Sequence, residues 1–162
     1  MNWQKIAECL RQELAEYGEL LRLFEEQQAS LFARDADSVL RVGGQIEEQA
    51  QILQGCRRHR EETVGHIAAA EGLPRQGTLR SLLPHMESSA RPLIEALINE
   101  VNHLLHRVRR TSRHNHAVLT RTLELHQETL QQLRPDAFTK TYAATGRVSL
   151  SSNSAGALRA AG

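Results

Sequence analysis

The sequence predicts an all-α protein: an elongated antiparallel bundle of three long helices with coiled-coil-like packing, followed by a flexible C-terminal tail. Apolar residues recur at three- and four-residue steps from Trp3 to Leu133, the spacing that places side chains on one face of a helix. Only 4% of the residues are aromatic, and Leu, Ala, Glu, Gln and Arg dominate, which favours helix. Breaks rich in Asp, Gly and Pro divide the pattern, and a Ser-, Ala- and Gly-rich tail follows it.

The first helix is expected to run from Trp3 to an acidic break at Asp35–Asp37. Its apolar stripe alternates four- and three-residue steps, the heptad pattern of helices that pack along their length. The stripe consists of Trp3, Ala7, Leu10, Leu14, Tyr17, Leu21, Phe24, Gln28 and Leu31. Leu20, Leu23 and Phe32 widen it, which predicts contact with more than one partner helix.

The second helix is expected to begin at an N-cap in the Asp35–Ser38 break and to end at Gly72-Leu73-Pro74. The pair Gly43-Gly44 weakens it by about 1 kcal/mol per glycine relative to alanine. Its apolar positions are Val39, Val42, Ile46, Ala50, Leu53, Cys56, Val64 and Ile67.

The third long helix is predicted to be the longest. It is expected to begin near Ser88 or Ser89, after a helical turn over Thr78–Leu83, and to end at Arg134-Pro135. One face carries Ile94, Ile98, Val101, Leu105, Val108, Ser112, Asn115, Leu119, Thr122, Thr129 and Leu133. A buried Asn at a core position sets the register of a helix at a cost in stability, and this is the role expected for Asn115.

Charge supports an antiparallel arrangement of consecutive helices. Residues 1–50 carry five Lys/Arg against ten Asp/Glu, whereas residues 101–162 carry nine against three. Short links make neighbouring helices antiparallel, and this topology places glutamates opposite arginines in two pairs of segments. These segments are Glu8, Glu13 and Glu16 with Arg57, Arg58 and Arg60, and Glu47 and Glu48 with Arg109, Arg110 and Arg113.

The same register leaves the end of the third helix without a partner. The second helix starts opposite about residue 122, so later apolar side chains project past the turn between the first two helices. These side chains, Leu123, Leu125, Leu130 and Leu133, form a candidate binding surface.

The sequence predicts a protein that is not an enzyme and that uses no cofactor or metal. Glu100 and His103 form a Glu-x-x-His pair, but a di-iron bundle needs a second pair and two further glutamates. The basic stretch His103–His116 lacks interleaved aromatic residues and has acidic partners in the predicted fold, which argues against nucleic-acid binding. Cys9 and Cys56 lack CxxC spacing and are expected to be reduced thiols.

The chain is expected to be cytoplasmic and to have two parts. Its N-terminus lacks the basic start and apolar core of a signal peptide, and no apolar run approaches the ~20 residues of a membrane span. Residues 1–134 are predicted to form the helical bundle, and residues 135–162 a mostly flexible tail. In the tail, Tyr142 stands four residues before Gly146. A lone aromatic in a flexible segment is typical of a docking anchor, and folding back on the bundle is the alternative.

These features together resemble the FlgN family of flagellar export chaperones, over about residues 6–147. The resemblance lies in the order of several short elements. They are Leu20-Leu21, Gln28–Leu31, the acidic break Asp35–Asp37, Arg57–Arg60, Asn115 with Leu119, and the Tyr-x-x-x-Gly element of Tyr142 and Gly146. The pair Gly43-Gly44 departs from the smoother helix usual in this family.

The resemblance implies a cytoplasmic, non-catalytic chaperone. Its clients would be hook-associated (hook–filament junction) proteins, held by their C-terminal helical segments until delivery to the flagellar type III export gate. Client binding would fall to Leu119, Leu123, Leu125, Leu130 and Leu133, and docking to the export gate and its ATPase complex to Tyr142 and Gly146. The exposed stripe also permits a homodimer. The alternative function is a coiled-coil structural adaptor with no role in export.

Overall fold

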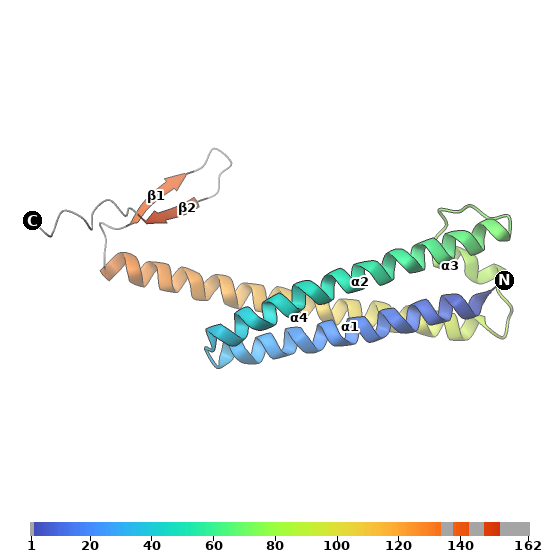
Figure 1. Cartoon of the computed structure of the whole chain (residues 1–162), viewed down its shortest axis with the longest axis horizontal. Coiled ribbons are helices and arrows are strands. Elements are labelled where there is room, and N and C mark those ends of the chain that lie inside the picture. The colour runs from blue at the N-terminus through green and yellow to red at the C-terminus, as the bar shows by residue number, and fades with distance from the viewer. Residues whose placement is uncertain (1, 134–137, 143–147, 153–162) are drawn as a thin grey trace, which may run out of the picture. The chain divides into compact units, whose positions relative to one another are not determined.

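The computed structural model describes residues 2–133, 138–142 and 148–152. The elements are α1 (Trp3–Phe32), α2 (Ala36–Ala70), α3 (Leu79–Leu82), the 3-10 helix η1 (Leu83–His85), α4 (Arg91–Leu133), β1 (Phe138–Tyr142) and β2 (Val148–Ser152) (Figure 1). The chain divides into two compact units, Met1–His116 and Ala117–Gly162, so α4 contributes to both.

The helical prediction is confirmed for the body of the chain, with one correction. The described residues form four α-helices rather than three, because the short turn expected over Thr78–Leu83 is a helix in its own right, α3. The longest helix, α4 with 43 residues, is therefore the fourth α-helix and not the third. The three long helices of the prediction correspond to α1, α2 and α4.

The turn between α1 and α2 lies in the predicted acidic break. Asp35 is the N-cap of α2, and its carboxylate accepts hydrogen bonds from the Ser38 backbone N–H at 3.1 Å and from the Ser38 hydroxyl at 2.6 Å. These hydrogen bonds lower the pKa of the Asp35 carboxyl. Arg34 adopts a positive φ of 56°, which reverses the chain direction just before the cap.

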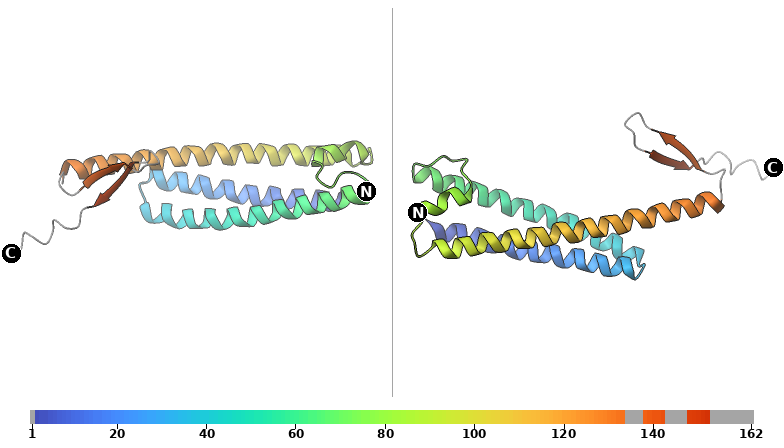
Figure 2. Two further views of the ribbon diagram at one scale, coloured as in Figure 1. Left: turned by 90° about the horizontal axis from the view of Figure 1, so that it is seen from above. Right: turned by 180° about the vertical axis from the view of Figure 1, so that it is seen from behind.

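In the unit Met1–His116, α2 runs antiparallel to α1, and α4 runs parallel to α1 (Figures 1 and 2). Between α1 and α2, the Gln49 amide donates to the Glu16 carboxylate at 2.6 Å. Between α1 and α4, Arg107 lies 3.6 Å from Glu25. The charge pairing predicted between the first two long helices is confirmed at one buried pair, Glu13 and Arg60.

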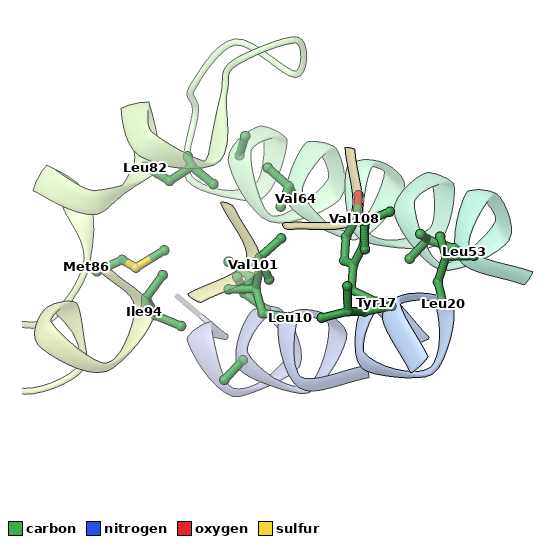
Figure 3. Packing of buried hydrophobic residues seen from close by; sticks show 14 residues of the cluster. Leu10, Tyr17, Leu20, Leu53, Val64, Leu82, Met86, Ile94, Val101 and Val108 are labelled. Carbon is green, nitrogen blue, oxygen red and sulfur yellow. The ribbon is translucent and has the colours of Figure 1, made fainter. Parts of the chain in front are cut away.

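The core of this unit is assembled from one face of each long helix and from the segment around α3 (Figure 3). Leu82 and Met86 close the end at which the chain passes from α3 to α4. The buried side chains of α4 occur at intervals of seven residues. They are Ile94, Val101, Val108 and Asn115. One seam of α4 therefore packs on the other two helices as far as Asn115.

The Glu13–Arg60 pair is buried within this core. Only 1% of the Glu13 side chain and 20% of the Arg60 side chain are exposed, and the two charged groups lie 2.7 Å apart. Their alignment is that of an ion pair rather than of a well-formed hydrogen bond. Burial raises the pKa of the Glu13 carboxyl, and the Arg60 and Arg57 guanidinium groups oppose that rise.

We expect Arg60→Met to lower the free energy of unfolding by about 3 kcal/mol near neutral pH, because it leaves a buried carboxylate without its partner. The folded-state pKa of Glu13 lies above its unfolded value, so the folded protein binds the additional proton, and stability rises as pH falls through that window. The destabilisation should therefore shrink at mildly acidic pH. Urea denaturation near neutral pH and at mildly acidic pH measures the loss of unfolding free energy. Adding Glu13→Gln should restore most of the loss, and an undiminished loss in the double variant would contradict this account.

The glycine pair inside α2 offers a second stability test. A Cβ added at Gly44 meets no atom within 4 Å, so we expect Gly44→Ala to stabilise the protein by about 1 kcal/mol through helix propensity. At Gly65 an added Cβ would lie 3.1 Å from the backbone oxygen of Arg75, so Gly65→Ala should give no such gain. Thermal denaturation of both variants checks the difference, and equal gains would refute it.

Candidate partner-binding site

A polar layer ends the buried core of α4. Asn115 is 1% exposed, and its side-chain N–H group donates to the Phe24 backbone oxygen at 2.8 Å and to the Gln27 side-chain oxygen at 3.2 Å. Gln27 is itself buried. The prediction that Asn115 occupies a core position is confirmed. These hydrogen bonds join α4 to α1 at one defined position, as expected of a buried Asn that sets register.

Beyond Asn115, no residue of α4 through Leu133 is buried. Leu119 is half-buried, and the four leucines predicted to lack an intramolecular partner are exposed. Their exposed fractions are 59% for Leu123, 45% for Leu125, 48% for Leu130 and 73% for Leu133. These values are high for large apolar side chains on one helix, so this segment stays the candidate binding surface.

Four of the five predicted leucines share one line along the helix. Leu119, Leu123, His126, Leu130 and Leu133, which we call the C-terminal seam, follow one another at steps of four, three, four and three residues. Leu125 lies outside this line, on the side of the helix that also carries Thr122 and Thr129. His126 was not among the predicted site residues, because the predicted helix face ran through Thr122 and Thr129, one residue away from Leu123 and Leu130.

The threonines beside the seam are already hydrogen-bonded within the helix. The Thr122 hydroxyl donates to the Val118 backbone oxygen at 2.9 Å, and the Thr129 hydroxyl donates to the Leu125 backbone oxygen at 2.8 Å. A partner that covers these side chains would leave neither hydroxyl without a hydrogen bond.

The structure places Tyr142 at the end of a strand. β1 and β2 form an antiparallel pair in which Tyr142 lies opposite Val148. Neither strand was predicted from the sequence, which was expected to form a mostly flexible tail here. Gly146, the other residue expected to dock at the export gate, lies outside the described residues.

The model of the FlgN protein family matches residues 1–149 of this chain. The chain belongs to the FlgN family. FlgN proteins are flagellar export chaperones that bind substrates of the type III export apparatus, and they form a family that is generally non-enzymatic. The family match confirms the resemblance drawn from the sequence. Searches of curated proteins and of solved structures gave no match.

In the part of the chain that the structure describes, no cluster of three or more His, Cys, Asp or Glu side chains could hold a metal ion. Cys9 and Cys56 are free thiols, and burial raises the pKa of the Cys56 thiol, which disfavours the reactive thiolate. Among the described helices, none has the length and apolar character needed to cross a membrane.

An open groove with a volume of about 530 Å³ lies between α1 and α2. Its lining includes Lys5, Glu8, His59 and His66, and Cys9 lies at its base beside Thr63, with 3.9 Å between the sulfur and the hydroxyl oxygen. The groove is open to solvent, and both polar and apolar side chains line it.

Proposed function

We propose that this FlgN-family protein is a cytoplasmic export chaperone for hook-associated proteins. It binds their C-terminal helical segments, prevents premature assembly, and delivers them to the flagellar type III export gate. The observation that carries the proposal is the row of exposed leucines on α4, in a chain whose family binds flagellar export substrates.

The client is held by a helix-on-helix contact. An amphipathic client helix lays its apolar face on Leu119, Leu123, Leu125, Leu130 and Leu133, the recognition mode in which apolar anchors recur every three or four residues. Burial of apolar surface contributes about 25 cal/mol per Å², and this must exceed the cost of ordering the client helix. Several leucines must therefore be covered together for binding at micromolar affinity or better.

Delivery is assigned to the tail. In this proposal residues 1–134 hold the client, while residues 135–162 carry the element of Tyr142 and Gly146 that contacts the export gate and its ATPase complex. Tyrosine suits a small transient contact, because it offers a large surface and a hydroxyl donor at little rotamer cost. Client binding and docking at the export gate then use different segments of the chain, so the protein can make both contacts at the same time.

Isothermal titration of the full chain with a purified junction protein tests the proposal. We expect micromolar or tighter binding of the intact junction protein and none of a version that lacks its C-terminal helical segment. Equal affinity for the two versions would refute the assigned client segment. A failure of every junction protein to bind would refute the client class and leave the adaptor function.

A further inference from the structure

The leucines of the C-terminal seam do not by themselves define how a client helix lies on them. Leu119 and Leu123 precede His126 by seven and three residues, and Leu130 and Leu133 follow it by four and seven. A row of leucines with this nearly symmetric spacing accepts an apolar helix shifted by one heptad, or in the opposite direction, at similar cost.

Charge beside the seam cannot supply the missing register. In coiled coils, charged residues that flank the apolar seam set partner choice and orientation. Here the four flanking positions are uncharged: Thr120, Thr122, Gln127 and Thr129. The charged side chains of this segment, Arg121, Glu124 and Glu128, follow one another on the opposite side of the helix, and Arg121 pairs with Glu124 at 3.5 Å.

Hydrogen-bonding groups beside the seam do not set the register of the client helix either. The hydroxyls of Thr122 and Thr129 donate hydrogen bonds within their own helix, so they need no hydrogen bond from a partner. His126 differs, because its imidazole is exposed and makes no hydrogen bond within the described residues. An apolar helix that covered it would leave a buried ring nitrogen or N–H group without a partner, at a cost in free energy.

We propose that His126 is the residue that fixes the register of the client helix on the C-terminal seam. This inference rests on the proposed function. The client that fits places one polar side chain against His126 and apolar side chains at the layers on either side. A helix that is shifted or reversed faces the imidazole with an apolar residue and is rejected. One polar position in an apolar seam thus lowers the affinity for the client somewhat and raises the specificity for one register.

The test maps the register of the complex directly. A photo-crosslinking amino acid replaces Gln127 in the full chain, a junction protein is bound, and the cross-linked client residue is identified by mass spectrometry. We expect a single cross-linked position for the parent chain. With His126→Leu, we expect equal or tighter binding, by up to about tenfold, and cross-links spread over client positions three, four or seven residues apart. His106→Leu, an exposed histidine earlier on α4, is the matched control and should keep the single position.

Three results would overturn the inference. The first is an unchanged single cross-link in His126→Leu. The second is weaker binding of this variant without a change in register, which would make His126 an ordinary contact. The third is an affinity that falls more than about tenfold when salt screens charges, which would mean that charge contributes to recognition. Failure of the parent chain to bind any junction protein would instead refute the proposed function.

Discussion

Replacing both Leu123 and Leu130 with serine should weaken client binding by about tenfold to a hundredfold while leaving the helix content unchanged. The two side chains are 59% and 48% exposed in the free protein, so their loss opens no cavity in the core. In the complex each would be covered by the client helix. Covering a fully exposed leucine contributes about 1.5–3 kcal/mol, and about half of each side chain is already covered in the free protein. The combined loss is therefore about 1.5–3 kcal/mol, which corresponds to one to two orders of magnitude in affinity. Isothermal titration with a junction protein and circular dichroism measure the two quantities.

Leu40→Ser is the matched control for this experiment. Leu40 is 76% exposed on α2, so the substitution removes the same kind of side chain from a helix surface that the proposal does not use. Its affinity for the client should equal that of the parent chain. A double variant at Leu123 and Leu130 that binds as tightly as the control would place the client surface elsewhere.

The second large effect concerns delivery. Tyr142→Ala should bind the junction protein normally, lose binding to the export-gate component, and reduce junction-protein export at least about tenfold. Removal of an aromatic anchor at the centre of a small interface typically costs more than 2 kcal/mol. Titration against the purified gate component and quantification of exported junction protein in cells provide the measurements.

Tyr142→Phe separates the ring from its hydroxyl. If the ring supplies most of the contact, this variant should retain most of the gate binding, because it keeps the apolar surface. If Tyr142→Ala loses client binding but keeps gate binding, the assigned division of labour is wrong. If it loses neither, the tyrosine has no part in either contact.

The long helices could be predicted from the sequence because their apolar residues repeat with the helical period over eight or more turns. The expected start of α1 at Trp3 and the break at Asp35 both match the structure, since the capping side chains of Asn2 and Asp35 are local signals that need no tertiary context. The separate status of α3 was harder to predict, because a four-residue helix is stabilised by the buried contact of Leu82 rather than by its own pattern.

The strands β1 and β2 could not be predicted from the sequence for a different reason. Phe138–Tyr142 alternates large and polar residues over only five positions, and Val148–Ser152 is rich in serine, which is as typical of a loop as of a strand. Strand pairing depends on the other strand, so neither segment carries enough information alone. Sequence patterns therefore identify long helices far better than short hairpins.

The leucines of the candidate site were predicted from helix lengths, but the line that they form was not. From Asn115, a helix face can continue through Leu119 to Thr122 or to Leu123, because steps of three and four residues are both compatible with 3.6 residues per turn. The structure distinguishes the two lines by hydrogen bonding, since the Thr122 hydroxyl donates to the Val118 backbone oxygen of the same helix. Because Leu123 rather than Thr122 belongs to the C-terminal seam, the next step of three residues places His126 on the seam.

The end of burial at Asn115 also affects how this protein can evolve. Mutations in a packed core are constrained by stability, because most of them lower the free energy of unfolding and few can be tolerated together. Residues 120–130 of α4 are all exposed, so substitutions there cost the fold little. If this segment binds the client as proposed, selection can change which export substrate is preferred without compensating changes in the bundle. We therefore expect residues 120–130 to vary among relatives. Asn115 and Gln27 should stay constant.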